Sequence, residues 1–440
     1  MNLKHLYIET YGCQMNVSDS ERIVSMLAAI GYTQNQTLKQ ADLILLNTCS
    51  VRGGAEEKIY KRLENLGHLK KSHKGLVIGV GGCVAQHEGD MLLEKFPWVD
   101  LVFGTHNLHL LPEMVAAAES GQRRSETAFI DNDQRLDLFP AVQESSRVSR
   151  FVTVMQGCDN YCSYCIVPYV RGPEISRRSS DILIEIDRLA AGGVKEVVLL
   201  GQNVNSYGFN APDQPSFSGL IRQIAGIEGI RRIRFTTSHP KDMSDDLIEC
   251  FATEAKLCGH IQLPAQSGSN AILERMNRGY TRESYLDRIR ALKAARPGIV
   301  ITGDMIVGFP GESEEDFEQT LALIEEVRYA DIYSFVYSPR PGTQAAELSE
   351  TLSREQKQER LERLLLIQRR ITLEINRSFV GSEQAVLVEG PGKRPGQVSG
   401  RADSGKTVNF IGIPGLVGSI ADVRIVAAYQ NSLVGELIKS

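Results

Sequence analysis

The chain has 440 residues, of which 42% are hydrophobic and 23% charged, and its formal net charge is −5 at pH 7. This composition is typical of a soluble globular protein, and the length suggests about three domains of roughly 150 residues each. The acidic balance excludes nucleic-acid binding through bulk charge, so any nucleic acid must meet local basic patches. No signal-like apolar core opens the chain and no apolar run is long enough to span a membrane, so we expect a cytoplasmic protein without a membrane partner. In that reducing compartment, the eight cysteines favour metal binding or catalysis over disulfides.

Residues 1–120 alternate apolar strand-like runs with amphipathic helices, which predicts an N-terminal parallel α/β sheet domain. The clearest strands are residues 3–9, 42–46 and 76–80, and they run into Cys13, Cys49 and Cys83. Loops that leave the carboxyl ends of parallel strands share one edge of the sheet, so these cysteines can converge in space. A lone cysteine is usually a buried filler, but three at one edge favour a three-thiolate iron–sulfur cluster.

The segment 121–149 is polar and aperiodic, which predicts a linker. Residues 150–376 resume the α/β alternation and predict a partial (βα)6 barrel, whose functional sites would lie at the carboxyl ends of its strands. Its expected strands are 151–155, 197–200, 233–236, 260–263, 300–307 and 332–337. A capping box of Ser353 and Gln356 predicts a long helix that runs to about residue 376. Residues 377–440 predict a small all-β barrel, of a size typical of nucleic-acid-binding modules, with strands at 384–389, 397–401, 407–411 and 419–427.

Three closely spaced cysteines, Cys158, Cys162 and Cys165, follow the first strand of the expected barrel. A C-x3-C-x2-C triplet with no fourth cysteine nearby suits a four-iron cluster with one iron left open. The alternatives are a zinc knuckle or buried thiols. Zinc prefers a fourth nitrogen or sulfur donor at short spacing, and residues 140–180 offer none. Cys250 and Cys258 lack ligand spacing and are expected to be core thiols.

Two further segments are candidates for ligand binding. In the run 170–177, Glu174 suits an ammonium group and Arg177 a carboxylate, although the run could also be a solvated charged loop. The run 306–312, with Gly308, follows another barrel strand, where a loop suits a nucleoside or methionine moiety and a plain turn is the simpler alternative. Basic clusters, each of which could be only a solvated face, together favour RNA over DNA as a partner. These are Lys58, Lys61, Arg62, Lys70, Lys71 and Lys74; Arg231, Arg232 and Arg234; and Lys393, Arg394, Arg401 and Lys406.

Together these motifs resemble the methylthiotransferase family of radical S-adenosylmethionine enzymes. The resemblance rests on the cysteine triplet, on the runs around Cys13 and Cys49, and on residues 170–177, 200–207, 266–269, 306–312 and 337–343, and it covers nearly the whole chain. The runs 14–16 (Gln-Met-Asn) and 50–52 (Ser-Val-Arg) resemble the tRNA-modifying branch, whereas the branch that modifies a ribosomal protein usually carries Pro-Lys-Asn after the first cysteine. Gln262 departs from the family pattern, because a histidine is expected before Leu-Pro.

The resemblance implies two [4Fe-4S] clusters and S-adenosylmethionine as cofactors. The catalytic and metal-binding residues would be Cys158, Cys162 and Cys165 for the radical cluster, and Cys13, Cys49 and Cys83 for an auxiliary cluster. The implied S-adenosylmethionine contacts are Glu174, Arg177, Gln202 and Gly308. The C-terminal module would be a TRAM RNA-binding domain, and an electron donor such as flavodoxin or ferredoxin would supply electrons.

The implied reaction inserts a methylthio group at C2 of N6-(dimethylallyl)adenosine at position 37, in the anticodon stem-loop of tRNA. Two alternatives keep every ligand and change the substrate: a threonylcarbamoyl-adenosine tRNA, or an aspartate of a ribosomal protein. A third, of another class, is a non-catalytic RNA-binding protein stabilised by zinc. Iron content and cleavage of S-adenosylmethionine discriminate the enzyme from this last alternative.

Overall fold

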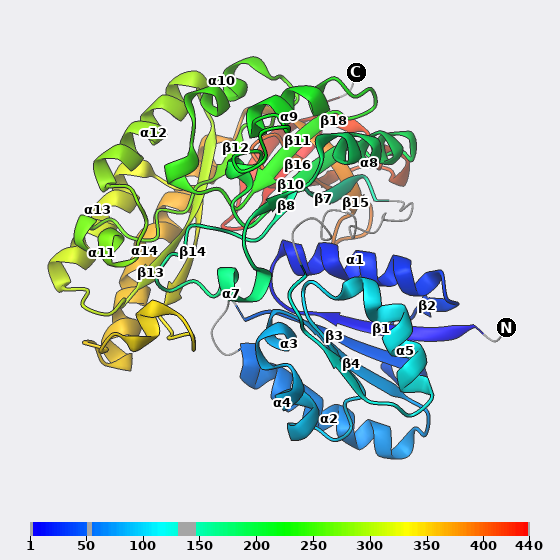
Figure 1. The fold of residues 1–440 in the computed structure, drawn as a ribbon. Coiled ribbons are helices and arrows are strands. Elements are labelled where there is room, and N and C mark those ends of the chain that lie inside the picture. The colour runs from blue at the N-terminus through cyan, green and yellow to red at the C-terminus, as the bar shows by residue number, and fades with distance from the viewer. Residues whose placement is uncertain (1–2, 51–54, 131–146, 439–440) are drawn as a thin grey trace. The chain divides into compact units, whose positions relative to one another are not determined.

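A computed structural model of the chain describes residues 3–50, 55–130 and 147–438. The chain divides into two compact units, each described by itself below (Figure 1). The first unit comprises residues 1–144, 155–159 and 165–177, and the second comprises residues 145–154, 160–164 and 178–440.

The first unit contains a six-stranded parallel sheet in the order β2-β1-β3-β4-β5-β6. Its strands are β1 (Lys4–Thr10), β2 (Tyr32–Gln34), β3 (Leu43–Thr48), β4 (Val77–Gly82), β5 (Leu101–Phe103) and β6 (Arg124–Glu126). The helices that connect these strands are α1 (Gln14–Ala28), α2 (Ala55–Ser72), α3 (Cys83–Glu88), α4 (Asp90–Lys95) and α5 (Leu111–Glu119). Every residue of β3 and β4 is buried, as expected for strands that carry helices on both faces.

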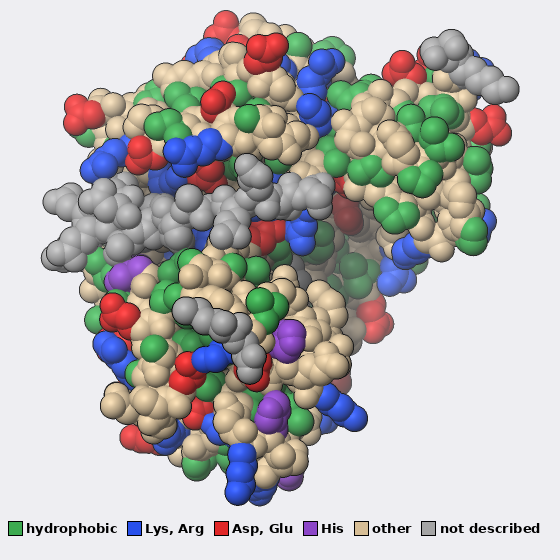
Figure 2. Space-filling view, turned by 90° about the vertical axis from the view of Figure 1, so that its right-hand side faces the viewer, with side chains coloured by type: hydrophobic (Ala, Val, Ile, Leu, Met, Phe, Trp, Pro, Cys, Tyr) green, Lys and Arg blue, Asp and Glu red, His purple; other side chains and the backbone are tan. Residues whose placement is uncertain are grey.

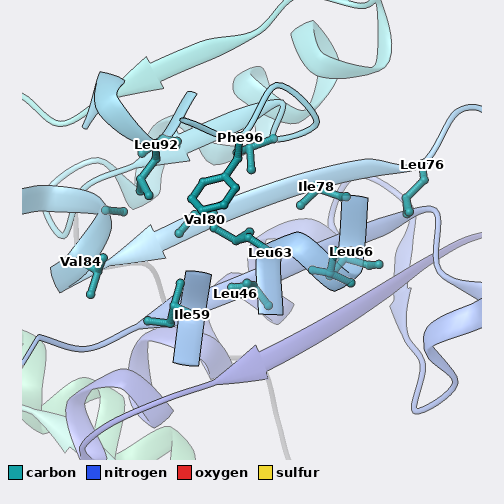
Figure 3. Close-up of a cluster of buried hydrophobic side chains, with 14 of the residues drawn as sticks. Leu46, Ile59, Leu63, Leu66, Leu76, Ile78, Val80, Val84, Leu92 and Phe96 are labelled. Atoms are coloured by element: carbon teal, nitrogen blue, oxygen red, sulfur yellow. The ribbon is translucent and has the colours of Figure 1, made fainter. Parts of the chain in front are cut away.

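Helix α2 packs on one face of this sheet because its apolar residues recur at helical spacing. Ile59, Leu63 and Leu66 lie against Leu46 and Val80 of the strands in one buried cluster (Figure 3). On the other face, side chains of α1 and α5 form a second cluster with strand residues. The sheet is therefore covered on both faces, and the cysteines follow the ends of its central strands.

The three strands expected in the N-terminal domain are β1, β3 and β4. The short strands β2, β5 and β6 were not predicted. Strand β6 pairs in parallel with β5, so the sheet continues into the segment 121–149 that the sequence analysis assigns to a linker. Residues 131–146 of that segment lie outside the described residues. A two-stranded antiparallel sheet of β8 (Met155–Gln156) and β9 (Ile175–Ser176), and the short helix α7 (Val167–Arg171) between them in sequence, complete the first unit.

The second unit contains six parallel barrel strands, which form the three-stranded sheets β11-β10-β7 and β12-β13-β14. Each coincides with a strand expected from the sequence. They are β7 (Ser149–Thr153), β10 (Glu196–Leu200), β11 (Arg232–Thr236), β12 (His260–Gln262), β13 (Val300–Val307) and β14 (Asp331–Val336). The accompanying helices are α8 (Ser179–Ala191), α9 (Phe217–Ala225), α10 (Asp245–Thr253), α11 (Asn270–Arg275), α12 (Arg282–Ala295), α13 (Glu314–Val327) and α14 (Arg354–Ser378).

The long helix α14 begins where the sequence predicts. The Ser353 side chain accepts a hydrogen bond from the Gln356 backbone at 3.2 Å, and the Gln356 side chain accepts one from the Ser353 backbone at 2.9 Å. This reciprocal capping box satisfies two amide groups that the helix itself cannot pair. No helix within the described residues is long and apolar enough to cross a membrane.

The C-terminal module is a closed five-stranded barrel in the order β15-β16-β17-β19-β18. The expected all-β module is confirmed, with β15 (Glu383–Pro391), β16 (Gln397–Ala402), β17 (Thr407–Ile411) and β18 (Ile420–Ala428) close to the predicted strands. Strand β19 (Leu433–Leu437) was not predicted, and it closes the barrel by pairing with both β17 and β18. Alternating residues such as Val398, Phe410 and Val423 fill the interior.

Within the second unit, two buried arginines of β11, Arg232 and Arg234, bind this module. Arg232 donates to the carbonyl oxygens of Arg401 and Ala385, each at 2.6 Å. Arg234 donates to the carbonyl oxygens of Asp403 at 2.9 Å and Ala402 at 2.7 Å. Both guanidinium groups are therefore used inside the protein. The hypothesis that they belong to an RNA-binding patch is wrong, because their donors are already committed and their side chains are buried.

Candidate functional site

The N-terminal cysteines all lie just beyond the carboxyl ends of adjacent strands. Cys13 precedes α1 and follows β1, Cys49 directly follows β3, and Cys83 directly follows β4 as the first residue of α3. In the strand order β2-β1-β3, the connections from β1 and β3 leave to opposite faces of the sheet. A crevice opens at such a switch point, and ligands of parallel sheets bind there.

Cys13 and Cys49 lie against each other. A Cβ atom built on Gly12, whose φ is +110°, would lie 2.2 Å from the Cβ and 2.7 Å from the Sγ of Cys49, so only glycine fits beside it. The side chain of Asn16 bonds to the carbonyl oxygen of Thr48 at 2.8 Å, which fixes the start of α1 to the end of β3. The sequence alone could not show that the two loops touch.

The Cys13 thiol is poised to lose its proton. A hydrogen bond with Cys49 lowers its pKa to about 6, burial opposes this change, and the charge of Arg171 supports it. Because the thiolate is the form that binds iron, this lowered pKa is compatible with the predicted role of Cys13 as a ligand.

Cys83 is buried beside the guanidinium group of Arg171. Burial raises the pKa of the Cys83 thiol, while the positive charge of Arg171, which also hydrogen-bonds to it, opposes the rise. Arg171 ends α7 and pairs with Asp19 of α1, with Nη2 and Oδ2 2.8 Å apart and side-chain exposures of 3% and 5%. A buried cation is costly unless anions surround it, so Arg171 fits a site that gathers thiolates. Neither Asp19 nor a separate role for Arg171 is predicted from the sequence.

Within the cysteine triplet, Cys158 and Cys165 are assigned to the first unit and Cys162 to the second. Cys158 follows β8, and its backbone amide donates to the carbonyl oxygen of Gly172 at 3.3 Å. A Cβ atom on Gly157, with φ +80°, would lie 2.0 Å from the carbonyl oxygen of Pro173, so glycine is required at this close approach.

Glu174 lies beside the Cys158 loop in the first unit. Its backbone amide donates to Oδ1 of Asp159 at 3.1 Å. Glu174 and Arg177 are both buried, which excludes the alternative of a solvated charged loop. Their position is compatible with the predicted ammonium and carboxylate contacts, but their role stays a prediction.

In the second unit, Cys162 contacts two residues that the sequence analysis missed. Nη1 of the buried Arg278 donates to the Cys162 Sγ at 3.3 Å, and Nε2 of His239 lies 4.0 Å from the same sulfur. Burial, and then the charges of Arg278 and Lys241, lower the pKa of His239 to about 2, so its ring is neutral. His239 could have been found as a polar residue soon after a barrel strand, at the end where such sites lie.

The other two predicted contacts, Gln202 and Gly308, follow β10 and β13, at the carboxyl ends of strands in the second unit. The amide of Gly308 donates to both carboxylate oxygens of Glu312 at 3.1 Å. Gly308 has φ +71°, and a Cβ atom there would lie 2.5 Å from Cγ of Lys357, so the turn requires glycine. Gln262 ends β12 and is tied to the amide of Thr237 and to Asp304, each at 3.0 Å.

The donor chemistry suits iron–sulfur clusters. Among the described residues, no three His, Cys, Asp or Glu side chains stand so that they could hold a metal ion. In a four-iron cluster, however, each thiolate binds a different iron, so the sulfurs need not meet at one point. Cys13, Cys49 and Cys83 offer sulfur donors at one edge of the sheet, one of them with a lowered pKa and one beside a buried arginine. The two ligand sets stay predictions that this chemistry supports.

Comparisons with known proteins agree with this architecture. Residues 5–104 match "Uncharacterized protein family UPF0004", residues 152–324 match the radical SAM superfamily, and residues 377–438 match the TRAM domain. The fold and these matches together define a radical S-adenosylmethionine enzyme with an N-terminal α/β domain and a C-terminal TRAM barrel. The expected fold class is confirmed, and a [4Fe-4S] cluster and S-adenosylmethionine follow from the superfamily.

Three curated relatives carry the name "tRNA-2-methylthio-N(6)-dimethylallyladenosine synthase". The protein from Pelobacter propionicus is 65% identical over 438 residues, and the alignment covers 100% of both chains. The protein from Trichlorobacter lovleyi is 63% identical, with 100% of both chains covered. The protein from Geobacter sulfurreducens is 62% identical, with 99% of this chain and 98% of the relative covered. The chain therefore belongs to the family of tRNA-2-methylthio-N(6)-dimethylallyladenosine synthases, which confirms the resemblance.

Solved structures share the fold at low sequence identity. The radical S-adenosylmethionine methyltransferase TsrM from Kitasatospora setae aligns with a TM-score of 0.60 at 14% identity, over 91% of this chain and 77% of its own. The cobalamin-dependent S-adenosylmethionine radical enzyme OxsB aligns with a TM-score of 0.53 at 15% identity, over 84% of this chain and 56% of its own. These likenesses concern the fold alone.

Proposed function

We propose that this chain is a tRNA methylthiotransferase that inserts a methylthio group at C2 of N6-(dimethylallyl)adenosine at position 37. The observation that carries the proposal is the identity of 65% over the whole chain with a synthase of that name. Relatives named for this tRNA substrate favour it over a threonylcarbamoyl-adenosine tRNA or a ribosomal protein aspartate. The predicted ligands are compatible with the chemistry, because Cys13, Cys49 and Cys83 follow the carboxyl ends of parallel strands and the other three cysteines share the loop after β8.

The first ligand set, Cys158, Cys162 and Cys165, holds the radical [4Fe-4S] cluster. That cluster, when bound, supplies the electron for reductive cleavage of S-adenosylmethionine, which yields a radical strong enough to abstract an unactivated hydrogen. Glu174 and Arg177 orient the ammonium and carboxylate groups of the methionine moiety by charge-assisted hydrogen bonds. Gln202 and Gly308 contact the cofactor from two strand ends of the second unit.

The second ligand set, Cys13, Cys49 and Cys83, holds an auxiliary [4Fe-4S] cluster and, with it, the sulfur to be transferred. The lowered pKa of Cys13 keeps one ligand ready as thiolate, and Arg171 compensates the negative charge of the site. The hydrogen bonds of Asn16 keep the Cys13 and Cys49 loops together. These residues bind and orient, whereas the transferred group comes with the cluster.

The partners in this proposal are the anticodon stem-loop of tRNA and a one-electron donor such as flavodoxin or ferredoxin, in the cytoplasm. The TRAM domain offers Lys393 and Arg394 to the RNA, because both are exposed in the loop between β15 and β16. Lys406 instead donates to the carbonyl oxygen of Ala330 at 3.1 Å, and Arg401 pairs with Glu389 at 2.6 Å. The basic patch expected on this module is therefore smaller than the sequence suggests.

The proposal is tested by mass spectrometry of tRNA nucleosides from cells that lack the gene. We expect the 2-methylthio derivative of N6-(dimethylallyl)adenosine to disappear and its precursor to accumulate. Plasmid-borne wild type and Cys258→Ala, which changes a buried cysteine outside both ligand sets, should restore the derivative. An unchanged nucleoside profile in the deletion strain would overturn the proposal, and loss of a threonylcarbamoyl derivative instead would favour the alternative tRNA substrate.

Two cysteine variants separate the roles of the two ligand sets. Anaerobically purified wild type should contain about eight irons per chain, four for each cluster. Cys158→Ala should abolish cleavage of S-adenosylmethionine, whereas Cys49→Ala should retain cleavage and lose methylthio insertion. Stoichiometric zinc without cleavage would identify a non-catalytic protein, and methylthiolation by Cys49→Ala would show that the N-terminal set does not carry the sulfur.

A further inference from the structure

Within the second unit, the loop that carries Cys162 is held by four consecutive residues, Arg275 to Arg278. The carbonyl oxygens of Arg275 and Met276 accept from the Ser163 hydroxyl at 2.8 Å and the Ser163 amide at 3.0 Å. The side chain of Asn277 donates to the carbonyl oxygen of Tyr161 at 3.0 Å. Arg278 completes the series by donating to the Cys162 sulfur at 3.3 Å. Three of these residues position the loop backbone or Ser163, and only Arg278 reaches the sulfur.

The Arg278 guanidinium group is fixed in place by its other hydrogen bonds. Its Nη2 donates to the carbonyl oxygen of Pro264 at 3.0 Å, and its Nε donates to the hydroxyl of Tyr280 at 3.0 Å. Arg278 is only 5% exposed. A charge that is both buried and immobile acts strongly on its neighbours, because little water screens it.

A cation at this position favours the reduced form of an iron–sulfur cluster. Reduction adds one negative charge to the cluster, and both nearby positive charge and hydrogen bonds to ligand sulfurs stabilise that charge. Nε2 of His239 lies farther from the same sulfur, at 4.0 Å. Among the described residues of the second unit, Arg278 is the permanently charged group that donates a hydrogen bond to this sulfur.

We propose that Arg278 is a positioning residue for the radical reaction, and that its hydrogen bond to the Cys162 sulfur raises the reduction potential of the radical cluster. The inference rests on the proposed function for the assignment of Cys158, Cys162 and Cys165 as cluster ligands. A one-electron donor of low potential then reduces the cluster more readily. The rate of S-adenosylmethionine cleavage depends on this potential, while Arg278 itself takes no part in bond making.

The experiment measures the reduction potential directly. Cys13, Cys49 and Cys83 are all replaced by alanine so that one cluster remains, and the reduced cluster is followed by electron paramagnetic resonance in an anaerobic redox titration. At the midpoint potential of this parent protein, we expect Arg278→Met to lower the ratio of reduced to oxidised cluster about tenfold, which is about 59 mV for a one-electron couple. Signals are normalised to bound iron, so partial loss of the cluster does not imitate a shift.

Three matched variants separate charge from structure. Arg278→Lys keeps the charge and should retain most of the potential, whereas Arg278→Gln keeps a neutral donor and should lower it. Asn277→Gly removes a loop hydrogen bond at a residue with φ +55°, which glycine adopts freely, and should leave the potential unchanged. If Arg278→Met fails to assemble a cluster, Arg278→Gln decides the question.

The inference is overturned if the Met and Gln variants keep the parental potential, or if Asn277→Gly lowers it as much as Arg278→Gln does. It also fails if the parent protein holds no cluster, or if Cys162→Ser leaves the resonance signal unaltered. The titration contains no tRNA, so an error in the proposed substrate would leave it unchanged. Conversely, an error about Arg278 would leave the tRNA nucleoside profile of the deletion strain unchanged.

Discussion

Replacing Arg234 by methionine is expected to weaken the contact between the C-terminal barrel and β11 of the large barrel. The Arg234 Nε lies 2.7 Å from Oε2 of Glu196, and the two side chains are 5% and 0% exposed. The remaining donors of Arg234 bind the carbonyl oxygens of Ala402 and Asp403. Methionine has similar length and no donor, so the variant removes these three bonds without leaving a large cavity.

The size of the effect follows from the groups that lose their partner. Removing one member of a buried ion pair costs about 3–5 kcal/mol, because the other charge stays buried. The Ser149 hydroxyl still donates to Glu196 at 2.9 Å, and Arg401 lies 3.4 Å from it, so we expect the lower end of this range. With a urea dependence of about 2–3 kcal/mol per molar, a loss of about 3 kcal/mol lowers the unfolding midpoint by about 1–1.5 M.

Two probes in one urea titration distinguish the units. Far-ultraviolet circular dichroism reports the helices and strands of both units, whereas tryptophan fluorescence reports the first unit alone, because Trp98 is the single tryptophan of the chain. A circular-dichroism change without a change in fluorescence therefore belongs to the second unit. The Trp98 indole donates to the carbonyl oxygen of Leu63 at 2.7 Å inside the first unit. We expect Arg234→Met to lower the circular-dichroism midpoint and to leave the fluorescence midpoint in place.

The matched control is Arg231→Met, which changes an exposed arginine three residues earlier in the same segment. It should alter neither midpoint, because exposed charges contribute little to stability. The reasoning is refuted if Arg234→Met shifts the circular-dichroism midpoint no more than Arg231→Met does. It is refuted equally if fluorescence and circular dichroism shift together, since the effect would then not belong to the second unit.

Three further outcomes follow from buried groups. Burial raises the pKa of the Glu196 carboxyl, but the charge and hydrogen bond of Arg234, together with Arg401 and Ser149, more than offset this, so the pKa is lowered in the folded state. The ionised carboxylate therefore stabilises the fold above the unfolded-state pKa, and this stabilisation is lost as pH falls through the folded-state pKa. The circular-dichroism midpoint of wild type should therefore fall more between pH 7 and pH 4 than that of Glu196→Gln, and equal slopes would contradict this. Gly12→Ala strains a left-handed backbone and places a methyl group against Cys49. Iron should therefore fall from about eight to about four per chain, with cleavage of S-adenosylmethionine retained. A full iron content would show that the methyl group does not disturb Cys49. Arg171→Met leaves the Asp19 carboxylate buried and should destabilise the first unit by about 3–5 kcal/mol, seen as a lower fluorescence midpoint, and an unchanged fluorescence midpoint would contradict this.

Long strands and well-capped helices could be predicted from the sequence, whereas short strands could not. Strands β3, β4 and β13 carry enough consecutive apolar or alternating residues to stand out, and Ser353 with Gln356 marks the start of α14. Strands β2, β5 and β6 have three residues each, which is too short for a period to be read. Their pairing depends on neighbours elsewhere in the chain.

The misassigned arginines show a second limit of sequence reasoning. Arg232 and Arg234 lie in a basic run that looks like a surface patch, and exposed basic runs are the common case. Their burial depends on the C-terminal module. Arg232 binds the carbonyl oxygen of Arg401, and Arg234 binds that of Asp403, and in both pairs the partner lies 169 positions later in the chain. Burial created by such distant segments leaves no local pattern.

The sequence by itself determined which family the chain belongs to, and it predicts which cysteines bind iron. Cysteine spacing and the strands that precede the cysteines are local properties, so they can be read directly from the chain. The tertiary structure alone decided which charges surround those cysteines. Asp19 meets Arg171 across 152 residues, and Arg278 meets Cys162 across 116 residues. A buried charge is tolerated only where the fold supplies its partners, and those partners are chosen by topology rather than by neighbouring sequence.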